Sequence, residues 1–149
     1  MKNQDLILTS PKSDNDFERY YRFRWQQLRK PLNLPLGSER DSLDINSFHC
    51  IALDNENSII GVGSIQPVDN NAMRIRYMAV TAEFRRLGVG SLIIKKLLDH
   101  AIKRNSSKCW LNARLSAVEF YRQQGFEVLS KVETDLEVPH FKMEISLIS

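Results

Sequence analysis

The chain of 149 residues is poor in cysteine and has no long apolar run. Its two cysteines, Cys50 and Cys109, lie far apart, which excludes a disulfide framework and a paired-cysteine metal motif. No stretch approaches the roughly 18 apolar residues of a membrane-spanning helix, and the first residues lack the apolar core of a signal peptide. We therefore expect a soluble, cytoplasmic protein with no metal site and no membrane partner.

Repeats, low-complexity segments and linker-like stretches are also absent. With 42% hydrophobic residues, a chain of this length is sufficient for one globular core and too short for two of ordinary size. We therefore expect a single domain over residues 1–149.

Charge is present in modest excess, with a formal net charge of +3, but it is distributed unevenly. Residues 17–40 contain six basic and two acidic residues. Arg19, Arg22 and Arg24 would suit a nucleic-acid-binding helix, but the sequence has no signature of a nucleic-acid-binding fold. We therefore expect no nucleic-acid partner, and we keep this class as an alternative that a steep salt dependence of binding would favour.

Apolar periodicity and turn residues predict a mixed α/β order of elements with an antiparallel meander in the first half. The expected strands cover 6–9, 48–53, 59–68, 74–80, 109–113, 126–132 and 141–148. The expected helices cover 15–29, the residues from Val89 onward, and 116–124. Ser13 with Asp14 and, later, Ser116 have the side chains of helix N-caps. Pro31, Pro35 and Gly37 predict a loop without regular structure after the first helix.

Two of these elements have a predicted inner face. In the first helix, the aromatic stripe contains Tyr20 and Tyr21, together with either Arg24 or Trp25. In the strand over 74–80, alternation places Ile75, Tyr77 and Ala79 on one face, and Arg74 and Arg76 on the other.

The run RRLGVG at 85–90 lies between this strand and the helix that starts at Val89. A helix N-terminus has unpaired backbone N–H groups and carries about half a positive charge, so it attracts anions. Gly88 and Gly90 would remove Cβ atoms that keep a pyrophosphate from these N–H groups, and Arg85 and Arg86 would neutralise its charge. Taken alone, the pattern is short enough to arise by chance, with Gly88 relieving a strained turn.

Two other nucleotide-binding motifs do not fit this turn. A Walker loop ends in Gly-Lys-Ser or Gly-Lys-Thr, whereas here Gly90 is followed by Ser91 and Leu92. A dinucleotide-binding fold needs three glycines that open an early βαβ unit, whereas this turn has two glycines after a meander.

Residues 77–80, the turn at 85–90, Asn112 and the run AVEFYRQQGF at 117–126 together resemble the GNAT superfamily of acyl-CoA-dependent N-acyltransferases. The resemblance covers nearly the whole chain, and its most specific parts are R-x-x-G-x-G and F-Y-x-x-x-G-F. It implies an α/β fold of the α+β type, with a mixed, mostly antiparallel sheet of about six or seven strands flanked by helices. It also implies an enzyme, an acetyl-CoA-dependent N-acetyltransferase.

The resemblance assigns a cofactor site around a splayed gap between the strands at 74–80 and 109–113. The strand backbone would pair with the pantetheine arm, and the amides of the turn would hold the pyrophosphate. The resemblance implies that Asn112 is a further contact to the cofactor. From its sequence position alone, Asn112 could equally be an exposed residue at the end of a strand. The implied acetyl-CoA-binding residues are Met78, Ala79, Val80, Arg85, Arg86, Leu87, Gly88, Val89, Gly90, Ser91 and Asn112.

The resemblance also assigns the chemistry, in which the acceptor amine attacks the thioester and Tyr121 protonates the leaving thiolate. A phenol within hydrogen-bond distance can do this, although the alternative of a core or helix-surface tyrosine stays open. Candidates for the base that accepts the amine proton are Glu39, His49 and His140. A catalytically silent module that binds acyl-CoA and acts through a partner is the alternative function. The acceptor, a small molecule or a peptide, is not specified by the sequence, and a homodimer is compatible with the family.

Overall fold

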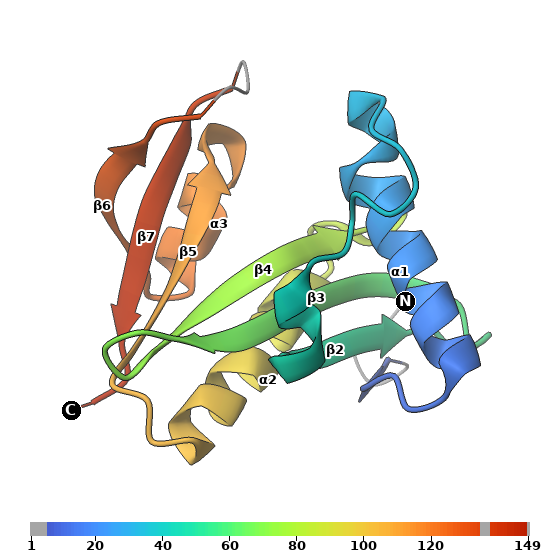
Figure 1. Ribbon diagram of the computed structural model, residues 1–149, viewed down its shortest axis with the longest axis horizontal. Helices are drawn as coiled ribbons and strands as arrows, with labels where there is room; N and C mark the ends of the chain where they lie inside the picture. The colour runs from blue at the N-terminus through green and yellow to red at the C-terminus, as the bar shows by residue number, and fades with distance from the viewer. Residues whose placement is uncertain (1–5, 135–137, 149) are drawn as a thin grey trace.

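A computed structural model describes residues 6–134 and 138–148, which form one seven-stranded sheet and three α-helices (Figure 1). The strands are β1 (Ile7–Thr9), β2 (Phe48–Leu53), β3 (Ile59–Val68), β4 (Ala72–Val80), β5 (Lys108–Arg114), β6 (Glu127–Val132) and β7 (His140–Ser146). The helices are α1 (Asp14–Leu28), α2 (Val89–Lys103) and α3 (Val118–Gln123). The spatial order is β1-β2-β3-β4-β5-β7-β6, and only the β4–β5 pair is parallel. This architecture confirms the predicted fold class.

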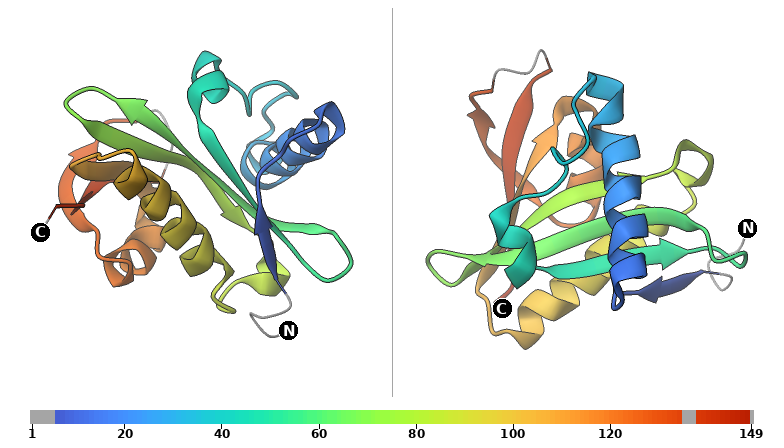
Figure 2. Two further views of the ribbon diagram at one scale, coloured as in Figure 1. Left: turned by 90° about the horizontal axis from the view of Figure 1, so that it is seen from below. Right: turned by 45° about the vertical axis from the view of Figure 1, so that its right-hand side comes forward.

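The two long helices cover opposite faces of the sheet (Figure 2). The residues that α2 buries recur at three- and four-residue steps and are Val89, Ile93, Ile94, Leu97 and Ala101. On the other face, α1 packs over Ile51 and Val62. Full burial of an aliphatic side chain of this size contributes about 1.5–3 kcal/mol, so the periodicity of the apolar residues determines which side of α2 packs against the sheet.

The start of α1 is set by a capping box. The Asp16 backbone N–H donates to Ser13 Oγ at 3.0 Å, and the Ser13 backbone N–H donates to the Asp16 carboxylate at 3.2 Å. These two bonds satisfy donors that the first helical turn leaves free, which explains why the N-cap was predictable from sequence.

The inner face of α1 differs from the predicted aromatic stripe. Its buried residues are Tyr20, Phe23 and Arg24, so the arginine and not Trp25 turns inward. The Trp25 indole N–H instead donates to the Leu34 carbonyl at 3.0 Å, at the edge of the helix. Helical spacing alone allowed both residues, and the contacts of Arg24 with distant segments decide between them.

Short 3₁₀ turns account for two further differences between the structure and the elements predicted from the sequence. Lys30–Leu32 and Ser42–Asn46 form such turns inside the segment that was expected to have no regular structure. Before α3, the turn Leu115–Ala117 replaces the predicted capping by Ser116, and no side chain caps that helix.

The sheet splays where β4 and β5 diverge (Figure 1). The two strands pair over only three residues of β4, Ala72 to Arg74. Beyond this point β4 continues to Val80 on β3 alone, and its register with β3 shifts between Val62 and Ser64. The splayed gap predicted from the resemblance is therefore confirmed.

A bulge at Tyr77 corrects the predicted alternation of β4. Tyr77 adopts φ +58°, a left-handed conformation that non-glycine residues rarely take. Ile75 lies in the core under α2, whereas Ala79 packs in the cluster under α1. The extra residue reverses the faces beyond it, so Ile75 and Ala79 are on opposite sides of the sheet and not on the same side.

Candidate active site

The free edge of β4 borders the splay. Met78 and Val80 pack toward the α2 core, and their strand has no partner on the side where β5 has moved away, within the described part of the chain. An edge with unpaired N–H and C=O groups can accept an extended ligand as an added strand. One group is already occupied, since Arg85 Nε donates to the Val80 carbonyl at 3.1 Å. A carbonyl oxygen accepts two hydrogen bonds, so a ligand can pair with this carbonyl beside Arg85 or in its place.

The glycine turn ends at an uncapped helix N-terminus. Gly88 is the N-cap of α2 with φ +86°, and no side chain caps the helix. Arg86 also has a positive φ, of 69°. Gly88 takes this conformation without the steric cost that a Cβ brings, and the first N–H groups of α2 stay open to an anion. A groove begins at Gly88 and Ser91 and follows the outer side of α2.

Gly90 serves helix packing, and its predicted role in ligand access stays a prediction. A Cβ at Gly90 would lie 3.0 Å from Phe120 Cζ, closer than ordinary van der Waals contact. The first turn of α2 therefore lies directly against α3. Gln124 strengthens this contact, because its Nε2 donates to Ser91 Oγ at 3.0 Å.

Tyr121 is brought to the same region by this helix packing. Its side chain is 8% exposed and packs edge-on against Phe120 and Phe126, with ring centroids 5.0 and 5.9 Å away. Burial raises the pKa of Tyr121 above its ordinary value, and the charge of Arg114 opposes this rise only in part. The hydroxyl is therefore protonated at neutral pH and able to donate a proton.

Asn112 and His140 lie on the strands beyond the splay. Asn112 is an exposed residue of β5 and pairs in register with Lys142 of β7. His140 is the first residue of β7, not part of a turn, and its Nδ1 lies 3.0 Å from the Val138 carbonyl. Each side chain is thus available to a ligand, but the structure shows no contact between them and Tyr121.

Both carboxylate oxygens of Glu39 are held by hydrogen bonds in a buried position, which does not suit a catalytic base. It is 2% exposed, Oε1 accepts from the Gly37 N–H at 2.8 Å, and Oε2 accepts from Arg40 Nε at 3.0 Å. Burial pushes the pKa of Glu39 upward, but these hydrogen bonds outweigh it and hold the pKa below its ordinary value. The contacts favour a structural role in the loop over proton abstraction.

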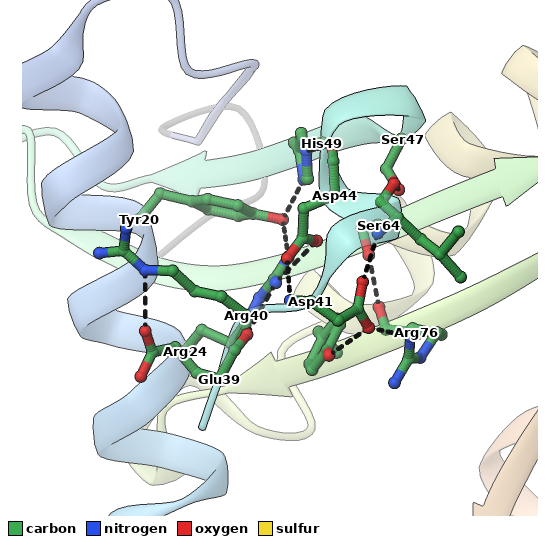
Figure 3. Close-up of polar contacts among 12 residues, drawn as sticks. Tyr20, Arg24, Glu39, Arg40, Asp41, Asp44, Ser47, His49, Ser64 and Arg76 are labelled. Atoms are coloured by element: carbon green, nitrogen blue, oxygen red, sulfur yellow. Dashed lines mark hydrogen bonds and ion pairs between the residues drawn. The ribbon is translucent and has the colours of Figure 1, made fainter. Parts of the chain in front are cut away.

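A buried polar network that sequence reasoning missed joins α1, this loop and β2 (Figure 3). Arg24 is fully buried and donates to Asp44 Oδ1 at 3.0 Å, to the Glu39 carbonyl at 3.0 Å and to the Tyr20 hydroxyl at 2.6 Å. The Tyr20 hydroxyl in turn lies 2.7 Å from His49 Nδ1. The sequence contained one sign of this network, because an arginine lies on the aromatic face of the first helix. Its carboxylate partner is 20 residues away along the chain.

Asp41 connects the same loop to the bulge. Its Oδ2 accepts from the Tyr77 hydroxyl at 2.9 Å and also from Arg76. The Arg24 guanidinium lies 3.8 Å from the centroid of the Tyr77 ring. The bulge conformation is therefore supported by contacts on both the ring and the hydroxyl.

Protonation of His49 is expected to destabilise the fold as the pH falls. Burial lowers the pKa of His49 below the ordinary value near 6.5, so the unfolded chain binds this proton more readily. The free energy of unfolding should therefore decrease as the pH falls from about 7.5 to about 5.5, measured by urea denaturation. His49→Gln should flatten this dependence, which separates His49 from His100, whose pKa burial also lowers. An unchanged slope in the variant would contradict the assignment.

The described residues contain no cluster of three or more His, Cys, Asp or Glu side chains able to hold a metal ion. No helix in the described ranges is long and apolar enough to cross a membrane. Cys50 and Cys109 are both buried free thiols, and burial raises the pKa of each to about 12.

The first-helix arginines do not form one exposed basic face. Arg24 is inside the protein, and Arg19 donates to the Asn57 carbonyl at 2.7 Å. These contacts weaken the alternative hypothesis that the first helix binds nucleic acid.

Comparison with models of known protein families identifies the family of this chain. Residues 36–147 match the model of the acetyltransferase (GNAT) domain. The chain belongs to the GNAT family. This acetyltransferase is 31% identical over 133 residues to the uncharacterized N-acetyltransferase YjcF of Bacillus subtilis (strain 168), with 89% of this chain and 94% of YjcF covered.

Solved structures share the GNAT fold at lower identity. A GNAT acetyltransferase from Staphylococcus aureus Mu50 superposes with a TM-score of 0.77 at 18% identity, covering 96% of this chain and 99% of that one. Escherichia coli ElaA gives 0.79 at 19% identity, covering 94% and 97%. An aminoglycoside 6'-N-acetyltransferase in complex with coenzyme A gives 0.80 at 11% identity, covering 96% and 98%.

Proposed function

We propose that this acetyltransferase moves the acetyl group of acetyl-CoA to an amine of a small molecule or a peptide. The observation that carries the proposal is the free β4 edge, which leads to the uncapped N-terminus of α2. Pantetheine would pair along Met78–Val80, and the amides from Arg86 to Ser91 would bind the pyrophosphate. The coenzyme A complex of the aminoglycoside 6'-N-acetyltransferase, which has the same fold, supports this use of the site.

In the proposed mechanism, the neutral amine attacks the thioester carbonyl and forms the new C–N bond. The C–S bond then breaks, and the Tyr121 hydroxyl gives its proton to the leaving thiolate. The amine proton passes to solvent or to a base, for which His140 is less constrained than Glu39. The protein supplies position and a protonated phenol, and no metal is needed. We further propose a cytoplasmic protein that forms a single domain, with a homodimer as the oligomer to test.

Release of free thiol from acetyl-CoA in the presence of a panel of amines tests the function. We expect turnover with at least one acceptor, and Arg86→Gln should raise the KM for acetyl-CoA about ten-fold through loss of a charge near the pyrophosphate. Lys103→Gln, an exposed charge change at the far end of α2, is the matched control. Binding of acetyl-CoA without turnover on any acceptor would support the silent module instead.

A further inference from the structure

The open face of β5 and β7 carries an aromatic residue between two cations. Trp110 of β5 is half-buried, with the Arg74 guanidinium 4.6 Å and the Lys142 ammonium 4.5 Å from its ring centroid. Arg74 and Trp110 are directly paired in the last register step before the strands splay. The three side chains thus form a continuous patch, here called the Trp110 patch, at the vertex of the splay.

The Trp110 patch lies on the sheet face opposite α2. Met73 and Ile75, which flank Arg74, belong to the core under α2, and so do the two neighbours of Trp110. Alternation along the strands therefore directs Arg74 and Trp110 to the face on which α1 lies. On that face α1 lies toward β2–β4, and the front of β5 and β7 stays uncovered in Figure 1.

Three acids on this face form ion pairs with other cations, whereas the two cations of the Trp110 patch form no ion pair among the described residues. Asp41 binds Arg76, Asp44 binds Arg24, and Glu144 lies 3.7 Å from Lys108. Arg74 and Lys142 have no acidic partner in the described part of the chain. The exposed Arg114 on β5 is a further positive charge on this face, whereas Glu144 pairs in register with Trp110 and the exposed Glu127 of β6 pairs in register with Glu144.

Unsatisfied donors point to a missing acceptor group at the same place. Arg74 Nε and Gln66 Nε2 are both buried without a hydrogen-bond partner, and these two residues are paired in register across β3 and β4. Gln66 is 3% exposed. Burial and the neighbouring Arg76 lower the pKa of Arg74, and Tyr77 and Asp41 oppose this only in part, so its charge is held at a cost. An anion would satisfy the donors and offset that cost.

We infer that the acceptor is a small amine that also carries an anionic group, a carboxylate or a phosphate, which binds to Arg74 and Lys142 over Trp110. The inference rests on the proposed acetyl transfer, because it places the acceptor in the same site. Arg74 lies three residues before the Tyr77 bulge, about 10 Å along the strand, so a small molecule reaches from the splay to the Trp110 patch. The same charges disfavour polycationic acceptors.

Acceptor pairs that differ only in charge test the specificity. Amino acids and dipeptides are compared with their C-terminal amides, and phosphoethanolamine is compared with ethanolamine, by thiol release from acetyl-CoA. We expect the acid form to be preferred at least ten-fold, with one of the two pairs identifying the anion. Arg74→Gln and Lys142→Gln should each raise the KM for that acceptor about ten-fold and leave the KM for acetyl-CoA unchanged. Equal use of both forms, or preference for the amide, would overturn the inference.

A binding measurement separates this inference from the proposed function. The indole N–H signal of Trp110 is followed by NMR during titration with inorganic phosphate, which requires no turnover. We expect saturable binding in the wild type and in Lys103→Gln, and about ten-fold weaker binding in Arg74→Gln. Failure of all acceptors with retained phosphate binding would reject acetyl transfer and keep the anion site. Absence of phosphate binding, or identical binding in Arg74→Gln, would reject the anion site.

Discussion

Tyr121→Phe is expected to lower kcat about 100-fold while leaving the KM for acetyl-CoA nearly unchanged. The substitution removes only the hydroxyl, and phenylalanine keeps the edge-on contacts with Phe120 and Phe126. Without the phenol, the thiolate must leave without a proton donor held by the protein, so the loss falls on the chemical step and not on cofactor binding. Steady-state thiol release at varied acetyl-CoA concentration measures both constants.

The control for this prediction is Tyr21→Phe, a change of the same size on α1, which should leave kcat unaltered. Equal thermal unfolding midpoints of the two variants would exclude a folding defect. Because burial raises the pKa of Tyr121, its hydroxyl stays protonated through the neutral range. Ionisation of Tyr121 should therefore not limit the wild-type rate between about pH 6 and pH 9. Full activity in Tyr121→Phe would remove this residue from the mechanism.

Asp44→Asn is expected to lower the free energy of unfolding by about 3 kcal/mol, because it leaves Arg24 charged and buried without its carboxylate. Arg24 is 0% exposed and Asp44 7% exposed, so water replaces little of the lost interaction. Burial opposes the charge of Arg24, while Tyr20 and Asp44 are among the groups that raise its pKa in the wild type. An arginine side chain is effectively always protonated in proteins, so the guanidinium keeps its charge in the variant as well. Urea denaturation monitored by circular dichroism gives the difference.

A double-mutant cycle separates the pair from general damage to the loop. Arg24→Met combined with Asp44→Asn contains no lone buried charge, so its loss should be smaller than the sum of the two single losses. Asp99→Asn, an exposed carboxylate change on α2, should alter stability by less than about 0.5 kcal/mol. Strict additivity of the two buried substitutions would contradict the proposed coupling.

Local signals in the sequence were sufficient for most of the element bounds. The limits of β2 and β3 and the start of α2 agree with the predicted 48–53, 59–68 and Val89. These elements depend on apolar periodicity and turn residues, which act over a few neighbours. The glycine turn was visible in the same way, whereas Tyr121 was singled out through the resemblance to the GNAT superfamily, whose motif there is contiguous. Their roles in binding acetyl-CoA and in proton transfer stay predictions.

The features that the sequence left open all depend on residues that are distant along the chain. Arg24 turns inward because Asp44 and Tyr20 receive its donors, and Tyr77 adopts a positive φ between β3 and the Asp41 loop. No periodic pattern encodes such contacts, since each requires two segments to meet in one arrangement.

The turn at Gly88 illustrates the division between sequence and tertiary structure. The sequence by itself determined that a glycine turn opens a helix beside a strand, because φ preferences and helix periodicity are local properties. Only the tertiary structure decided that Gly90 faces Phe120, that β4 and β5 part after Arg74, and that the cations around Trp110 lack acidic partners. Packing between helices and register between strands set these distances, and neither is a property of any short segment.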